Sequence, residues 1–195
     1  MDASTEVGLG RLLKLFLPRR SAKDDFRPLD FGMLQVAMML AAMDGTVIEL
    51  EIGVFGKLAR KCRGWTAEAA EEALEVGLHA AGYLMIQSHR LTERHLIKAF
   101  VDEAMKVLSG AFVAGSVIDK RRAFVMWIAM ACCDRRFAVV ERKAVLALRR
   151  RLGLEKVVTD RFLREVEDQF RRLGHEDTVV EAVRTLGSFL DLEDV

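Results

Sequence analysis

Hydrophobic residues recur along this chain at the three- and four-residue spacing of an α-helix face, and no stretch alternates between apolar and polar residues as a half-buried strand does. Glycines, capping residues and polar junctions separate the helical segments. The segment 109–118 is small and apolar, which is typical of a tight connection or a short buried turn. The sequence therefore predicts an all-α fold of about eight helices. After an N-terminal helix, we expect helices over 30–43, 49–62, 66–82, 91–108, 120–133, 139–151, 155–173 and 175–190.

Two of these segments, 30–43 and 120–133, are apolar on almost every face, as helices in the centre of a protein core are. Their longest uncharged stretches, Met33 to Met43 and Ala123 to Cys133, are about half the ~20 residues that a membrane-spanning helix requires. We therefore expect two buried core helices and no membrane span.

A pattern of apolar helix, acidic loop and amphipathic helix occurs twice. Asp44 and Glu51 lie seven residues apart in the first copy. Asp134 and Glu141 lie seven residues apart in the second copy, at an offset of 90 residues. Such an internal repeat predicts two related halves that pack around a pseudo-two-fold axis with their apolar helices side by side. Three further pairs are identical at this offset: Ala41 and Ala131, Leu58 and Leu148, and Arg60 and Arg150.

The repeat sets the expected domain organisation. Residues 29–195 form one helical domain, with halves of about 30–108 and 119–191, after an accessory helix and linker over residues 1–28. Within this accessory segment, residues 9–20 combine leucines with four basic side chains. That composition allows contact with an anionic membrane surface, although docking on its own domain or on a partner is favoured, and it is too charged for a secretory signal.

The two motifs carry a resemblance to a known family. Ala-Ala-Met-Asp44-Gly45-Thr-Val-Ile-Glu-Leu-Glu51, repeated at Ala-Cys-Cys-Asp134 to Glu141, resembles the TerB-like family over roughly residues 30–173. This family includes tellurite-resistance TerB proteins and the N-terminal domain of membrane-anchored DjlA co-chaperones. The resemblance implies an all-helical domain with dyad-like halves and a non-enzymatic role in stress response or as a scaffold near membranes. It further implies a divalent-metal site built from Asp44, Glu51, Asp134 and Glu141.

The chemistry of four carboxylates fits a hard cation. Calcium and magnesium take oxygen ligands, whereas zinc and copper prefer histidine and cysteine. The alternating ligand ladder of an EF-hand is missing here. The expected cofactor is therefore calcium or magnesium, bound by the four motif acids.

The same residues also have a purely structural interpretation. An aspartate after a helix forms a turn, and a glutamate near a helix N-terminus is stabilised by the helix dipole without a metal. Ile48 and Ala138, three residues before the glutamates, have no hydroxyl group, so no capping box is expected. In the second copy, Arg135 and Arg136 replace the glycine of the first and can pair with Asp134, which would fill the site.

Composition narrows the remaining classes of function. The chain has 30 basic and 29 acidic residues and a net charge of +1, which does not favour nucleic-acid binding.

The three cysteines, Cys62, Cys132 and Cys133, have neither metal-binding nor redox spacing. We expect them to be buried thiols in the cytoplasm, with the charge of Asp134 opposing thiolate formation. The clusters 120–122 and 149–151 are basic, and a solvated helical face is favoured over a patch for phosphate or anionic lipid.

No nucleotide-binding, nucleophile or zinc-hydrolase motif occurs, so we expect no enzymatic activity. The function that follows is a TerB-like stress-response or interaction module with an unidentified protein partner, which binds a divalent cation through the two acidic loops. The alternative is a peripheral membrane adaptor or scaffold that uses the basic helix over residues 9–20.

Overall fold

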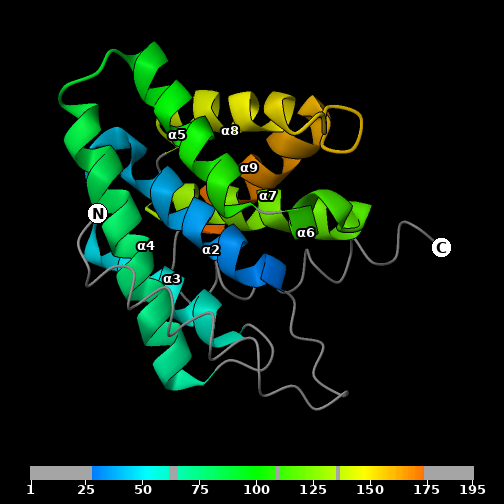
Figure 1. The fold of residues 1–195 in the computed structure, drawn as a ribbon. Helices are drawn as coiled ribbons and strands as arrows, with labels where there is room; N and C mark the ends of the chain where they lie inside the picture. The colour runs from blue at the N-terminus through cyan, green and yellow to red at the C-terminus, as the bar shows by residue number, and fades with distance from the viewer. Residues whose placement is uncertain (1–27, 62–65, 109, 135–136, 174–195) are drawn as a thin grey trace.

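A computed structural model describes residues 28–61, 66–108, 110–134 and 137–173 of the chain. These residues form eight α-helices and one short 3₁₀-helix, with no strand among them, which confirms the predicted all-α fold (Figure 1). The elements are α2 (Pro28–Ala41), η1 (Ala42–Asp44), α3 (Glu49–Lys61), α4 (Ala67–Ser88), α5 (Glu93–Val107), α6 (Gly110–Ala114), α7 (Val117–Cys132), α8 (Val139–Arg151) and α9 (Asp160–Leu173).

The two apolar helices form the centre of the core, as predicted. α2 packs directly against α7, and α3, α4 and α5 also contact α2. The residues from Leu34 to Met43 and from Ala123 to Cys133 are buried throughout. The indole N–H of Trp127 in α7 donates a hydrogen bond of 2.8 Å to the backbone carbonyl of Met33 in α2. Complete burial thus explains why these two segments show no polar face.

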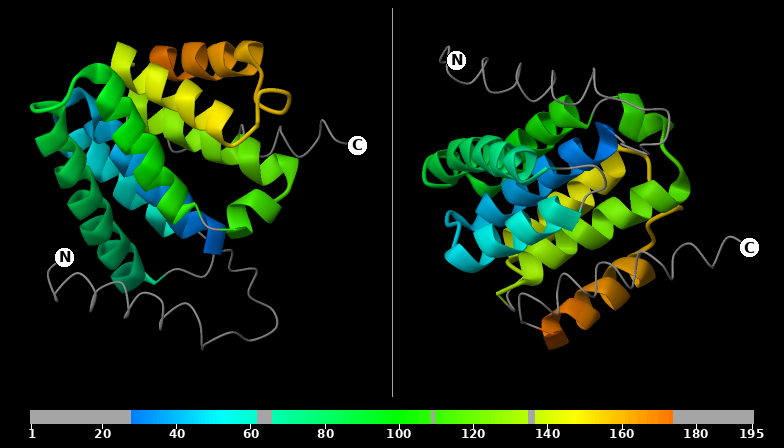
Figure 2. Two further views of the ribbon diagram at one scale, coloured as in Figure 1. Left: turned by 45° about the horizontal axis from the view of Figure 1, so that its top comes forward. Right: turned by 90° about the horizontal axis from the view of Figure 1, so that it is seen from below.

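The other helices cover this pair from several sides. α5 packs against α8, while α9 packs against α7. Both views of Figure 2 place α9 at the edge of the bundle, far from α4. The pseudo-two-fold relation between the halves stays a prediction.

Several predicted helix boundaries are confirmed by their capping interactions. α2 runs into η1, and the chain then turns at Gly45, whose φ of 96° is left-handed and whose N–H donates to the carbonyl of Ala42. A β-carbon at Gly45 would lie 2.9 Å from the Ser88 hydroxyl, so this position requires glycine. Thr66 caps α4 by accepting a hydrogen bond from the N–H of Ala69.

Three boundaries were predicted wrongly. α7 begins at Val117 rather than at 120, because Ser116 and Asp119 form a capping box before it. α4 continues through Gly82 to Ser88, because Leu84 is fully buried and its packing outweighs the weak helix propensity of one glycine. α9 begins at Asp160 rather than at 155, since residues 155–158 form a turn whose N–H groups at Val157 and Val158 donate to the carbonyl of Leu154. The segment 109–118 contains a short helix, α6, rather than only a connection.

Some predictions concern residues outside the described part of the chain. These are the N-terminal helix over 9–20, the helix over 175–190, Cys62, Arg135 and Arg136. Within the described ranges, none of the helices is both long and apolar enough to cross a membrane.

Candidate functional site

The two motif glutamates occupy the same local position at the starts of α3 and α8. The Glu51 carboxylate accepts a hydrogen bond of 2.8 Å from the backbone N–H of Ile48. The Glu141 carboxylate accepts the equivalent bond, 2.7 Å long, from the N–H of Ala138. Only 6% of Glu51 and 2% of Glu141 is exposed, although glutamate is rarely buried unless it has a partner.

These bonds form the glutamate half of a capping box. Ile48 and Ala138 have no hydroxyl to return the second bond, so each glutamate accepts one N–H, from the residue before its helix, and the reciprocal bond is absent. The predicted absence of a capping box is therefore correct for the hydroxyl half and wrong for the glutamate half. A glutamate at the third position of a helix is typical of this half of the box and could have predicted it.

The two motif aspartates lie at the ends of the apolar helices. Asp44 ends η1 and is exposed, and its Oδ1 accepts hydrogen bonds from the backbone N–H (2.9 Å) and the hydroxyl (3.0 Å) of Thr46. Asp134 follows α7 and is half-buried. Asp44 thus forms the turn expected of an aspartate after a helix.

Packing between the two units brings the four acids into electrostatic contact. η1 packs against α8, and α3 packs against α7. Burial raises the pKa of Glu51 to about 7, and the negative charges of Asp44 and Asp134 add to this rise against the lowering effect of the Ile48 hydrogen bond. Burial raises the pKa of Glu141 to about 9, with further contributions from Asp44, Glu51 and Asp134. The pKa of each glutamate is therefore raised by acids from both copies of the motif.

The donor set suits a hard cation, but the side chains are not arranged as a complete coordination shell. Among the residues that the structure describes, no three acidic, histidine or cysteine side chains are placed to hold a metal ion together. One oxygen of each glutamate is occupied by a backbone N–H. The Oδ1 contacts of the exposed Asp44 are with Thr46 of its own turn.

The adjacent cysteines are inert neighbours of this cluster, as predicted. Cys132 and Cys133 are completely buried and form no disulfide. Burial, followed by the charges of Glu51, Asp134 and Glu141, raises the pKa of the Cys133 thiol to about 12. Burial also raises the pKa of Cys132. Both residues are therefore protonated thiols at neutral pH and poor nucleophiles.

A second group of buried charges joins α8 to α9. The Glu167 carboxylate accepts from the guanidinium groups of Arg142 (2.6 Å) and Arg171 (2.9 Å). Arg149 donates to the carbonyl of Val158 (3.0 Å) and pairs with Asp160 (2.6 Å). Both Glu167 and Arg149 are at least nine-tenths buried.

The predicted solvated face over residues 149–151 is therefore wrong for Arg149. This residue lies eight positions after Glu141 and four after Val145, on the face of α8 that packs inward. That helical spacing indicates a buried position for Arg149. The adjacent Arg150 and Arg151 instead made the whole segment resemble an exposed basic face.

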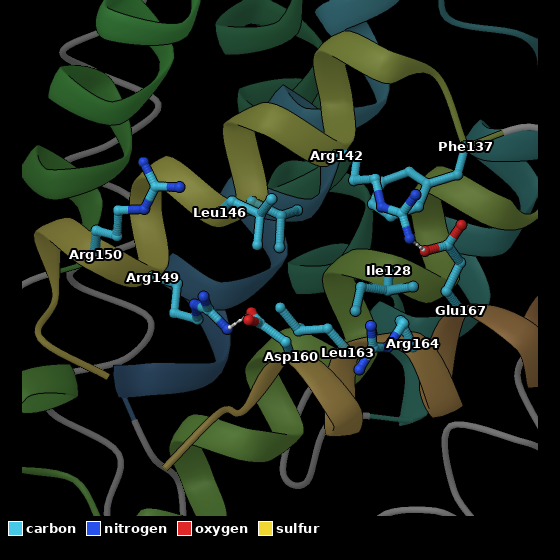
Figure 3. A pocket seen from close by; sticks show the side chains of 11 residues that line it. Ile128, Phe137, Arg142, Leu146, Arg149, Arg150, Asp160, Leu163, Arg164 and Glu167 are labelled. Carbon is cyan, nitrogen blue, oxygen red and sulfur yellow. Dashed lines mark hydrogen bonds and ion pairs between the residues drawn. The ribbon is translucent and has the colours of Figure 1, made fainter. Parts of the chain in front are cut away.

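An open cavity of about 310 Å³ lies beside these ion pairs. Figure 3 shows the Arg149–Asp160 pair at one end and the Arg142–Glu167 pair at the other, with apolar side chains between them. The lining comes from α7, α8 and α9 and from Phe137. It comprises Ile128, Phe137, Val145, Leu146, Leu163, Arg142, Arg149, Arg150, Arg164, Asp160 and Glu167.

No protein-family model, curated protein or solved structure matches this chain. The fold defines an all-helical domain. The resemblance to the TerB-like family therefore rests on the two acidic motifs alone.

Proposed function

We propose that this chain is a non-enzymatic helical module of the TerB-like kind that binds calcium or magnesium through Asp44, Glu51, Asp134 and Glu141. In this proposal the module acts in stress response through a protein partner, and cation occupancy sets the conformation of the two acidic loops. The observation that supports it best is the burial of Glu51 and Glu141 close to the acids of the opposite motif.

Burial of these two glutamates is costly without a compensating positive charge. Taking a carboxylate out of water costs several kcal/mol, and like charges nearby add to that cost. Within the described part of the chain, neither Glu51 nor Glu141 forms an ion pair with a lysine or arginine. Helix capping alone does not require this arrangement, because an exposed serine, threonine or aspartate caps a helix at lower cost. A bound cation would neutralise both glutamates together.

The competing account is that protons neutralise the glutamates. The raised pKa values of about 7 for Glu51 and about 9 for Glu141 are those of carboxyls that hold protons near neutral pH. A cation and a proton compete for the same oxygens, so cation binding must release protons. The two accounts therefore differ in whether added calcium or magnesium produces any binding heat.

The test is calorimetric titration of calcium and of magnesium into chelator-treated full-length protein at pH 7.5. We expect binding by the wild type and by Glu68→Gln, because Glu68 also lies in the first turn of a helix but is exposed. We expect at least a tenfold weaker affinity for Asp44→Asn and for Glu51→Gln, since each removes a charged oxygen ligand. Absence of heat from the wild type with both cations would overturn the proposal.

A further inference from the structure

The α8–α9 cavity combines an apolar wall with a surplus of positive charge. Five of its lining residues are apolar: Ile128, Phe137, Val145, Leu146 and Leu163. Four arginines and two acids complete the lining, which leaves two more positive than negative groups. At about 310 Å³ the cavity is at the lower end of the size range of small-molecule sites.

One buried donor in this lining lacks an acceptor. Arg149 is 94% buried, and its Nε–H has no hydrogen-bond partner among the described residues, although its terminal nitrogen contacts Val158 and Asp160. A buried N–H without an acceptor costs about 1–3 kcal/mol, more when the group is charged. The Nε atom itself has almost no exposed surface, so Arg149 contributes positive charge at this end of the cavity rather than a contact to a ligand.

Two further cations in the lining are available to an anion. Arg150 and Arg164 are exposed, and within the described ranges neither forms an ion pair. Figure 3 shows the Arg164 side chain beside Leu163, between the two ion-paired ends of the cavity, whereas Arg150 extends away from the other labelled side chains. Arg164 is therefore the better placed of the two to meet a charged group over the apolar wall.

We propose that this cavity binds a small amphipathic carboxylate, with its carboxylate on Arg164 and its hydrocarbon part against Ile128, Leu146 and Leu163. The apolar wall disfavours a fully hydrated anion such as inorganic phosphate, because the oxygens that face the wall would lose water and gain no hydrogen bond from it. The surplus of arginines disfavours a neutral apolar ligand, because such a ligand would displace water from the guanidinium groups and offer them no acceptor. Charge and apolar surface together select an anion with a hydrocarbon tail. This inference concerns α8 and α9 and does not rest on the proposed cation site.

The test uses octanoate as the probe, added to the full chain and followed by ¹H–¹⁵N NMR and by calorimetry. We expect saturable binding of octanoate, with shifts on α8 and α9, and at least tenfold weaker binding of octanol and of inorganic phosphate. Octanol keeps the tail without the charge, and phosphate keeps the charge without the tail. Equal binding of octanol would overturn the role of charge, and binding of phosphate alone would overturn the amphipathic ligand.

Two variants on the cavity and one control assign the site. Arg164→Gln removes one exposed cation and is expected to weaken octanoate binding about tenfold, as loss of one charge-assisted contact does. Leu146→Trp fills the cavity without a change of charge and is expected to abolish binding. The matched control is Arg161→Gln, since Arg161 lies on the same helix, pairs with Glu165 and does not line the cavity. Octanoate binding that is absent from the wild type, or unchanged in both cavity variants, would overturn the proposal.

Discussion

Replacement of Glu141 by glutamine should stabilise the protein, and increasingly so as the pH rises. The buried Glu141 carboxyl has a pKa of about 9 in the folded state, against an ordinary value of 4.5. Because the folded pKa is the higher one, the folded state binds more protons than the unfolded state between these two values. The contribution of Glu141 to stability is therefore fully present below about pH 4.5 and is lost as the pH rises towards 9.

The magnitude follows from linkage. Between pH 6 and 8 the unfolded state has released the Glu141 proton and the folded state has kept it, so the wild type loses about 1.4 kcal/mol per pH unit from this group. Glutamine does not titrate, and its amide oxygen can still accept the hydrogen bond from the Ala138 N–H. The free energy of unfolding of Glu141→Gln should therefore exceed that of the wild type by about 3 kcal/mol more at pH 8 than at pH 6.

The assay is urea unfolding followed by far-ultraviolet circular dichroism at pH 6, 7 and 8, with a chelator present so that no cation binds. Glu68→Gln is the control. A hydrogen bond from its own backbone N–H, together with one from Thr66, lowers the pKa of the exposed Glu68 carboxyl. Glu68 is therefore ionised in both the folded and the unfolded state from pH 6 to 8. The difference in free energy of unfolding between Glu68→Gln and the wild type should stay constant over this range. A difference between Glu141→Gln and the wild type that does not change with pH would refute the reasoning.

Four further predictions concern other parts of the chain. Gly45→Ala should lower the free energy of unfolding by about 1–2 kcal/mol, because φ is 96° and the new β-carbon would meet the Ser88 hydroxyl at 2.9 Å. Gly82 lies within α4, and a β-carbon there would meet no other atom within 4 Å. Gly82→Ala should therefore raise the free energy of unfolding by about 0.5–1 kcal/mol in the same assay, and a lower free energy of unfolding would contradict this account of the helix. Cys133 should resist alkylation at pH 8 in the native state and react rapidly in urea, measured by mass spectrometry of its peptide, since burial raises its pKa to about 12; fast native labelling would show that the thiol is accessible. Deletion of residues 1–20 should reduce flotation with anionic liposomes if the basic amphipathic segment contacts membranes, and equal flotation of the two chains would exclude that role.

The central part of the fold could be predicted because its physical cause is local. Two helices that are apolar on almost every face are stable in water only when both are buried, and α2 and α7 do pack together in the core. The end of α2 was equally predictable, since Asp44-Gly45 combines a turn-forming side chain with a residue that adopts positive φ. Thr66 likewise caps its helix as expected.

The remaining features depend on distant residues. Gly82 suggested a helix end, yet the burial of Leu84 keeps α4 intact. Arg149 lies among other arginines along the chain, and only the position of α9 provides Asp160 and the Val158 carbonyl as its partners. For the candidate site, the repeat identified the four acids, whereas their electrostatic contact arises from the packing of the two units.

The most direct test of the proposed cation site is a count of the protons released when calcium or magnesium binds. At pH 7.5 Glu141, with a pKa of about 9, is protonated, and Glu51, with a pKa of about 7, is largely ionised. Titration of the wild-type protein in two buffers should therefore give heats that differ by the difference in their ionisation enthalpies, multiplied by about one released proton per bound cation. No binding heat in either buffer, or heats that are equal in both, would contradict a cation held by these two buried glutamates.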